Sequence, residues 1–111
     1  MRVLTVNALL KNEKFTPVVI VDGDREIDGA YCGDLLSWVM GKAEENNAFV
    51  TIMTNVNVLA VASLINMSVV IVCEDAELSD EFISNAQTKE INVVKSSMPS
   101  YETCVALSKL I

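Results

Sequence analysis

The run Val69-Val70-Ile71-Val72 constrains the fold more than any other part of the sequence. All of its residues are apolar and β-branched, and a strand without polar alternation is typical of a central parallel strand covered on both faces. Strand-like and helix-like hydrophobic periods alternate on either side of it. The chain is therefore predicted to be an α/β protein, a three-layer α/β/α sandwich around a mostly parallel sheet of about five strands.

Short β-branched runs bounded by turn residues mark the expected strands, and apolar residues spaced three and four apart mark the expected helices. Asp34, Ser79 and Ser100 are expected to cap three of these helices. The segment 26–31 is expected to pair with the preceding strand as a hairpin. The expected strands cover residues 17–21, 26–31, 49–53, 69–72 and 91–94, and the expected helices cover residues 5–11, 34–43, 58–65, 79–89 and 100–111.

The second and third expected helices carry many apolar residues. Leu35, Leu36, Val39 and Met40 are expected to form the buried stripe of the second helix. The third helix is apolar nearly all round, so it is expected to be covered on more than one side.

Length and composition indicate one domain with apolar residues to spare. The 111 residues suit a single compact domain covering residues 1–111. The composition is 51% hydrophobic, which is more than a small soluble monomer needs for its core. The surplus is expected to meet another protein surface, and a homodimer is the simplest such arrangement.

Acidic residues dominate the charge balance. The chain has 15 Asp and Glu against 8 Lys and Arg, a net charge of −7 at pH 7, and its basic residues are scattered. Such a chain repels phosphate backbones and anionic lipids, so neither nucleic acid nor a membrane is an expected partner. The charge-free stretch 46–73 is interrupted by Asn and Ser and contains no apolar run long enough to span a bilayer.

The cysteines Cys32, Cys73 and Cys104 are widely spaced and odd in number. This spacing fits neither a disulfide framework nor a zinc site, and free cysteines usually occupy small core positions. No long apolar run follows Arg2, so no signal peptide is expected. The sequence predicts a cytoplasmic protein with free thiols and without a bound metal or cofactor.

Small polar residues follow the predicted strands at the positions where ligands collect in α/β proteins. The binding crevice of such a sheet lies beyond the carboxyl ends of its strands, where helix N-termini present free N–H groups. The same residue types also serve as caps and turns, and that alternative stays open. The candidate ligand-binding residues are Asp34, Thr54, Asn55, Asn57, Cys73, Glu74, Ser96 and Ser97.

Catalytic motifs are mostly absent from the sequence. The chain contains no His, which removes the usual general base, the serine and cysteine triads and the commonest metal ligand. Gly41-Lys42-Ala43 lacks the upstream glycine and the following Ser or Thr of a phosphate-binding loop. Carboxylates beside Cys73 would disfavour its thiolate. We therefore expect a binding protein and not an enzyme.

The segments Gly29–Met40 and Thr54–Leu64, together with Ser100-Tyr101-Glu102, resemble the DRTGG domain family. The resemblance covers nearly the whole chain and is strongest to short, free-standing members. These are often labelled HPr kinase-like, by kinship with an N-terminal domain of that kinase. The resemblance implies a single DRTGG-like domain with three α/β layers and no established catalytic activity.

The resemblance also implies a regulatory setting. DRTGG domains occur beside CBS nucleotide-sensing domains or in hydrogenase-associated gene clusters, and related domains pair as dimers. The implied function is a ligand-sensing and self-association module with a small nucleotide-like ligand. The alternative is a structural or docking subunit for a hydrogenase- or kinase-associated protein partner. Kinase activity is not implied, because phosphoryl transfer in HPr kinase belongs to a separate phosphate-loop domain.

The sequence departs from the family pattern in two places. No Asp-Arg pair occurs near Thr54–Asn57, and Cys73-Glu74 stand where the family has paired glycines. A glycine pair lets a ligand approach the backbone closely. Its replacement therefore favours a protein-interaction role for this chain.

Overall fold

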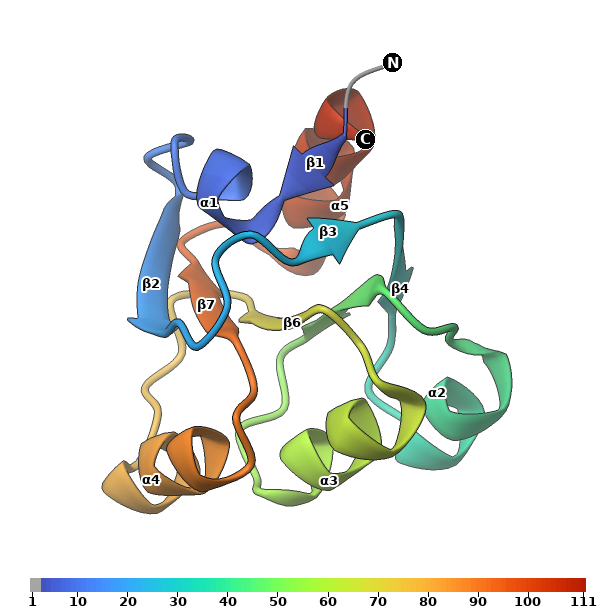
Figure 1. The fold of residues 1–111 in the computed structure, drawn as a ribbon, viewed down its shortest axis with the longest axis vertical. Helices are drawn as coiled ribbons and strands as arrows, with labels where there is room; N and C mark the ends of the chain where they lie inside the picture. The colour runs from blue at the N-terminus through green and yellow to red at the C-terminus, as the bar shows by residue number, and fades with distance from the viewer. Residues whose placement is uncertain (1–2) are drawn as a thin grey trace.

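A computed structural model describes residues 3–111 of the chain (Figure 1). The main sheet has five strands in the order β2-β7-β6-β5-β4, and β1 and β3 form a separate two-stranded ribbon. Strands β4 to β7 are parallel, and β2 pairs antiparallel with β7. The elements are β1 (Leu4–Thr5), α1 (Val6–Leu9), β2 (Phe15–Val19), β3 (Glu26–Ile27), β4 (Gly29–Cys32), α2 (Leu36–Lys42), β5 (Asn47–Thr51), α3 (Asn57–Ile65), β6 (Val69–Val72), α4 (Asp80–Thr88), β7 (Val93–Ser96) and α5 (Ser100–Leu110).

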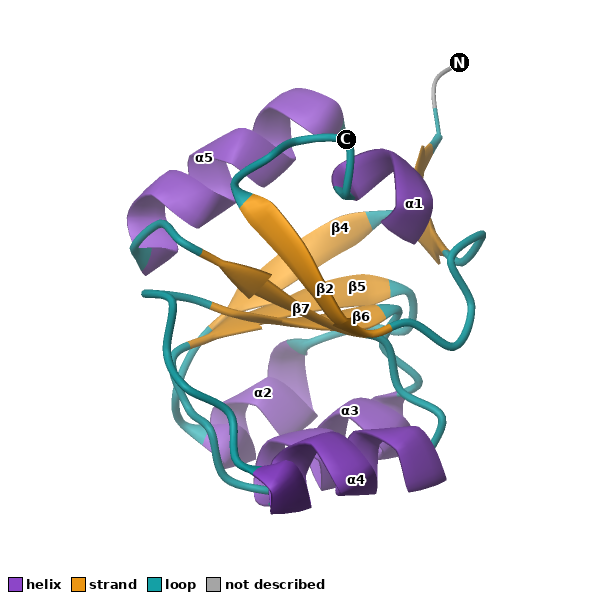
Figure 2. Cartoon of the chain, turned by 90° about the vertical axis from the view of Figure 1, so that its left-hand side faces the viewer, coloured by secondary structure: helices purple, strands orange, loops and turns teal. Residues whose placement is uncertain are grey.

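The sheet lies between two helical layers (Figure 2). Helices α2, α3 and α4 cover one face, and α1 and α5 cover the other. Each face has its own hydrophobic cluster, with Phe49 and Phe82 on the α2–α4 side and Ile71 and Leu107 on the α5 side. The predicted α/β sandwich around a mostly parallel sheet of about five strands is confirmed.

Strand β6 lies at the centre of the sheet, between β5 and β7. All of its residues are fully buried, because side chains alternate between the two faces and both faces are covered by helices. The continuous β-branched run therefore has the position that the sequence predicts.

The expected hairpin at residues 26–31 is wrong. The segment divides at Asp28 into β3, which pairs with β1, and β4, which pairs in parallel with β5. The amide of Val6 donates to the carbonyl of Arg25, and that of Asn7 donates to Gly23. These bonds bind the turn after β2 to α1, so the chain is carried away from β2 before β3 begins.

The expected buried stripe of α2 is confirmed in part. Val39 is fully buried and Leu36 packs against the same hydrophobic cluster, whereas Leu35 and Met40 are largely exposed. In α3, which was expected to be covered on more than one side, Asn57, Ala60, Ser63 and Leu64 are exposed. Helix α2 lies beside the outermost strand, β4 (Figure 1), so it has a neighbouring helix on one side only.

The helix caps are confirmed in part. Thr5 and Ser79 accept bonds from the amides of Ala8 and Phe82, as N-caps do. Ser100 is instead the first residue of α5, and Pro99 occupies the cap position without a side-chain bond. Proline is compatible with that position because it needs no backbone N–H partner.

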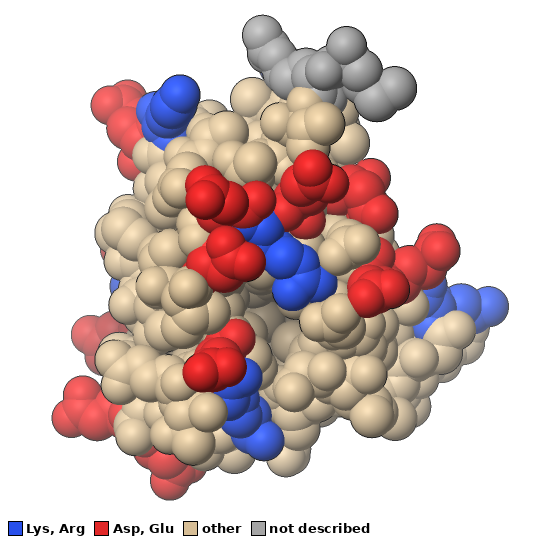
Figure 3. Space-filling view, in the orientation of Figure 1, with Lys and Arg blue, Asp and Glu red and all other residues tan. Residues whose placement is uncertain are grey.

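Charged side chains are dispersed over the surface. In the view of Figure 3, Lys and Arg lie scattered among Asp and Glu and form no continuous basic patch. None of the helices within residues 3–111 is long and apolar enough to span a membrane.

Candidate functional site

The carboxyl ends of β4, β5, β6 and β7 meet at one edge of the sheet, because these strands are parallel and in register. The structure places the predicted residues in the loops that leave this edge. They divide into two groups: some are engaged in internal hydrogen bonds, and others present their side chains to solvent. Whether any of them binds a ligand stays a prediction.

Asp34 connects two strand ends and does not cap α2 as expected. Its Oδ1 accepts a 2.7 Å bond from Thr51 Oγ1 and a 3.0 Å bond from the amide of Ile52. The N-cap of α2 is Leu35, without a side-chain bond. The carboxylate satisfies a donor at the end of β5, so its role here is structural.

Ser96 is buried and fixes the start of α5. Its Oγ lies 2.8 Å from Thr103 Oγ1 and accepts a bond from the amide of Met98. Thr103 Oγ1 is itself 2.9 Å from the carbonyl of Pro99. This buried hydroxyl network has no free group to offer a ligand.

The three cysteines, distant in sequence, converge near the first turns of α5. Partial burial of the thiol and the neighbouring Cys104 thiol together raise the pKa of Cys32 to about 11. Burial likewise raises the pKa of Cys73, an effect that the hydroxyls of Thr103 and Ser100 partly offset. All three are free thiols. The expected buried thiol is confirmed for Cys73, but Cys32 is exposed because it lies on the edge strand.

Neither Cys32 nor Cys73 is arranged as a nucleophile, since the raised pKa of each thiol leaves little thiolate at neutral pH. In the part of the chain that the structure describes, no group of three His, Cys, Asp and Glu side chains could hold a metal ion.

The loop between β5 and α3 presents Thr54, Asn55 and Asn57 to solvent. Asn55 Oδ1 accepts a 3.0 Å bond from the amide of Asn57, so this side chain is partly engaged. The first turn of α3 contains no acidic residue, whereas α4 begins with Asp80 and Glu81. The positive end of the α3 dipole is therefore the less neutralised of the two.

The loop after β6 has an unusual backbone. Glu74 and Asp75 have φ values of 65° and 50°, in the left-handed region that glycine adopts most readily. Their amides donate to the carbonyls of Met98 and Ser96, and Asp75 pairs with Lys95 at 3.2 Å. Acidic residues thus occupy a glycine-like backbone, and these contacts hold the loop against the segment after β7.

Ser97 completes the predicted set. Its side chain is exposed, while its amide donates to the carbonyl of Lys14, just before β2. Thr54, Asn57, Glu74 and Ser97 are therefore the predicted residues that leave side-chain groups toward solvent.

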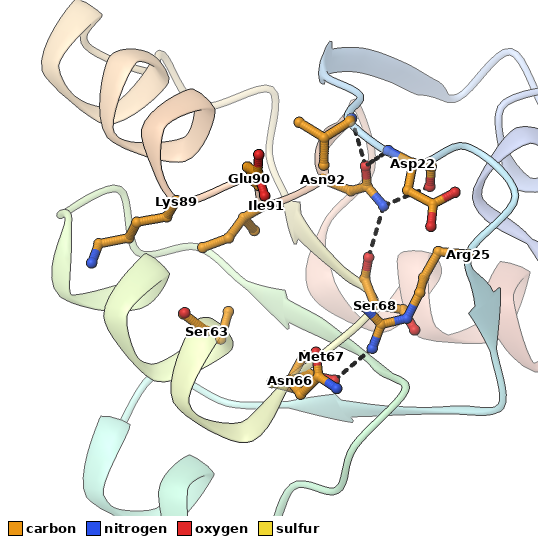
Figure 4. A pocket seen from close by; sticks show the side chains of 12 residues that line it. Asp22, Arg25, Ser63, Asn66, Met67, Ser68, Lys89, Glu90, Ile91 and Asn92 are labelled. Carbon is orange, nitrogen blue, oxygen red and sulfur yellow. Dashed lines mark hydrogen bonds between the residues drawn. The ribbon is translucent and has the colours of Figure 1, made fainter.

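A small polar cavity of about 100 Å³ lies at the opposite edge of the sheet, where β6 and β7 begin (Figure 4). Arg25 Nη2 donates to Asn46 Oδ1 at 2.9 Å and to the carbonyl of Asn66 at 2.7 Å. The amide group of Asn92 bonds Asp22 and Ser68. Nucleotide-sized pockets measure roughly 300 Å³ or more, so this cavity suits only water or a small ion.

Sequence reasoning missed this cavity. Asn46 and Asn66 both have positive φ, which asparagine tolerates better than most residues. Their positions just after predicted helices are a signal for left-handed turns. The hydrogen bonds of Arg25 to Asn46 and Asn66 depend on the path of the turn after β2, and no nearby sequence pattern predicts them.

Two larger grooves flank the end of α5. They measure about 530 and 520 Å³, and both are bordered by Val3, Leu4 and Leu110. Glu26 and Asp28 lie along one groove, and Lys11 along the other. None of the predicted ligand-binding residues lines either groove.

No family model and no curated protein matches the sequence. Among solved structures, the fold is similar to the CBS and DRTGG domains of the regulatory region of Clostridium perfringens pyrophosphatase, complexed with its activator diadenosine tetraphosphate. The TM-score is 0.73 at 16% sequence identity. The match covers 96% of this chain and 45% of the pyrophosphatase chain, so this chain spans less than half of that one. The chain has a DRTGG-like fold, as the sequence resemblance predicts.

Proposed function

We propose that this chain is a cytoplasmic regulatory module that binds a small nucleotide-like ligand, self-associates and performs no catalysis. The observation that carries the proposal is the fold shared over 96% of the chain with a regulatory region that was solved with a dinucleotide activator. The lack of His and the raised pKa values of Cys32 and Cys73 support the non-catalytic part. Free thiols fit a reducing compartment.

The start of α3 is the proposed place for a phosphate group. Thr54 and Asn57 are exposed there, and the positive end of a helix dipole stabilises anions. The first amides of this helix already have partners, because those of Asn57 and Val58 donate to Asn55, so the dipole and the exposed side chains carry this proposal. Helix α4 is a poorer candidate because Asp80 and Glu81 already occupy its first turn. Ser97 follows β7 at the same edge of the sheet, but β6 lies between β7 and β5, the strand that precedes α3.

Thermal unfolding with ATP, AMP and diadenosine tetraphosphate tests the ligand. A nucleotide at a hundredfold excess over its Kd is expected to add about 2.7 kcal/mol to the stability of the folded state. If none of these nucleotides raises the Tm, the ligand part of the proposal is wrong.

The variant Asn57→Asp tests the location. A carboxylate at the helix start stabilises the free protein by about 0.3–1 kcal/mol, yet it should repel a phosphate and weaken nucleotide binding at least about tenfold. Ser63→Asp is the matched control, because it adds the same charge to an exposed position near the other end of α3 and beside the small cavity. A larger loss of nucleotide affinity in Ser63→Asp would place the binding site at the opposite edge of the sheet.

A docking function for a protein partner is the second candidate. The exposed apolar side chains Leu35 and Trp38, three residues apart at the start of α2, favour it, since exposed apolar groups that lie together often mark contact surfaces. Equilibrium binding to a purified partner, unaffected by Asn57→Asp and without any nucleotide effect, would support this function over ligand sensing.

A further inference from the structure

Strand β4 forms one border of the main sheet. It pairs with β5 on one side, and no strand within residues 3–111 lies on its other side. The amide of Gly33 donates to the carbonyl of Val50 in β5. Because successive residues of a strand point their backbone groups to opposite sides, Ala30 and Cys32 direct theirs toward the open border.

The usual protection of an edge strand is missing from β4. Edge strands commonly carry lysine or proline, or a bulge that bends them away from other strands. Residues Gly29–Cys32 contain no charge and no proline, and the pairing with β5 is in continuous register. Ala30 and Cys32 are exposed, so β4 is accessible as a template for another strand.

Exposed apolar side chains lie on the helices that cover the two faces of the sheet near β4. Leu35 and Trp38, in and before α2, are each 59% exposed, and Tyr101 in the first turn of α5 is 76% exposed. Helix α2 lies beneath the sheet and α5 above it (Figure 2), and α5 packs on β4. A second surface docked along β4 would therefore meet apolar side chains above and below the strand.

We propose that β4 pairs antiparallel with β4 of a second copy of this chain, so that the two five-stranded sheets become one continuous sheet. This inference rests on the self-association part of the proposed function and names its surface. The two outward-facing residues fix the register, because Ala30 of each copy must lie opposite Cys32 of the other for both to bond. Tyr31 then lies on the two-fold axis.

A second copy fits this surface better than a charged partner. The chain carries a net charge of −7, so most of its faces repel those of a second copy, while strand β4 itself carries no charge and Asp28 and Asp34 lie only at its ends. Covering an aromatic side chain of this kind buries roughly 150–250 Å². Because Trp38, Tyr101 and Leu35 are already partly buried, they and the strand supply only part of the roughly 800 Å² per partner of a stable interface, and the flanking helices must supply the rest.

The ends of the paired strands carry like charges. In the proposed register Asp28 of one copy lies opposite Asp34 of the other, and Asp28 is exposed. Salt screens such repulsion. The dimer is therefore expected to tighten as the salt concentration rises, whereas an interface held by ion pairs would weaken.

Sedimentation equilibrium of the full chain tests the surface. Wild type is expected to dimerise, and Ala30→Lys should weaken the dimer at least about tenfold by placing like charges across the axis. Thr16→Lys is the matched control, because Thr16 is an exposed residue of the other edge strand and gains the same charge. Equal dimerisation of wild type and Ala30→Lys would overturn the proposal.

Cross-linking tests the register independently of charge. Ala30→Cys would face Cys32 of the other copy at a Cα separation of about 5.5 Å, within the range of a disulfide. Mild oxidation with diamide should then give a covalent dimer on a non-reducing gel, and Thr16→Cys should not. Equal yields of covalent dimer from the two variants would overturn the proposed register.

The failures of this inference and of the proposed function are distinguishable. A wild-type chain that stays monomeric at high concentration contradicts self-association altogether. If the chain dimerises, but Ala30→Lys does not weaken the dimer and Ala30→Cys gives no specific cross-link, self-association is supported and β4 is rejected as its surface. Nucleotide binding, measured on the same variants, reports on the ligand separately.

Discussion

The two borders of the main sheet, β2 and β4, are built in opposite ways. Strand β2 contains Pro17, shifts register between Pro17 and Val19, and runs antiparallel to β7. Strand β4 is parallel, regular and uncharged. Proline and an irregular ladder prevent further pairing at one border, while nothing comparable protects the other. The difference is what motivates the proposed pairing at β4, since only this border lacks a proline and an irregular ladder.

Asn92 is expected to give the largest effect, because it anchors the chain that leaves β2. Its buried amide accepts from the amides of Val21 and Asp22 and donates to the carbonyls of Asp22 and Ser68. Asn92→Ala leaves these groups unpaired and should cost about 2–4 kcal/mol of unfolding free energy. Urea denaturation measures this loss. Gln87→Ala, at an exposed helical position, should change stability by less than about 0.5 kcal/mol, and equal losses would show that β2 needs no such anchor.

Cys32 reports on the β4 border through its reactivity. Its pKa is raised from 9.0 to about 11, so at pH 8 roughly 0.1% is thiolate and alkylation should be about 100-fold slower than for an ordinary thiol. The rate should rise about tenfold per pH unit until pH approaches 11, because only the thiolate reacts. Mass spectrometry of iodoacetamide-labelled peptides measures it. Fast labelling of Cys32 at pH 7 would show that the pKa of this thiol is not raised.

Folding stability should follow the same titration. The raised folded-state pKa of Cys32 means that the folded state binds this proton more tightly than the unfolded chain. The stabilisation of the folded state by this protonated thiol is therefore present below pH 9 and is lost as pH rises toward 11. Cys32→Ser should flatten the stability profile in this window, and an unchanged profile would contradict the assignment.

Trp38→Glu sharpens the contrast between the borders. A buried charge at the proposed interface should weaken the dimer about tenfold or more. The stability of the monomer should change by less than about 0.5 kcal/mol, since Trp38 is largely exposed and its ring faces Lys42 Nζ at 5.7 Å from the ring centre. Sedimentation measures the first effect and urea denaturation the second. Ile20→Glu, just beyond β2, should leave the dimer intact.

Pro17→Val attempts to open the protected border and should have the smallest effect. It restores a backbone N–H on β2 and should change stability by less than about 1 kcal/mol, because valine suits a strand. A small gain in concentration-dependent light scattering is expected, since an unprotected edge can pair. No gain would indicate that the register shift at Val19 is sufficient protection without the proline.

Local sequence patterns predicted most of the secondary structure. Val69–Val72 reads as a central strand because its β-branched side chains need apolar cover on both faces. Ser79 reads as a helix cap because its hydroxyl can bond the amide of Phe82 within one turn. Such signals involve residues close in the chain, so they do not depend on the tertiary structure.

The candidate site was predicted less well because it depends on distant partners. Asp34 has the residue type of a cap, but Thr51 and Ile52 of the next strand provide its donors. From the sequence, Ser96 was expected to offer its hydroxyl to a ligand at the end of a strand. In the structure α5 covers it, and its hydroxyl bonds Thr103 instead. Polar residues at strand ends thus serve the sheet as well as any ligand, and sequence does not separate the two uses.

The alternation of β-branched runs with amphipathic segments follows from the sequence and already specifies an α/β fold around a mostly parallel sheet. Which strand became the open border was decided only in three dimensions. Gly29–Cys32 could have paired with β2 as a hairpin, but parallel pairing with β5 placed it outermost. Strand order depends on contacts between residues far apart in the chain, and no local propensity encodes them.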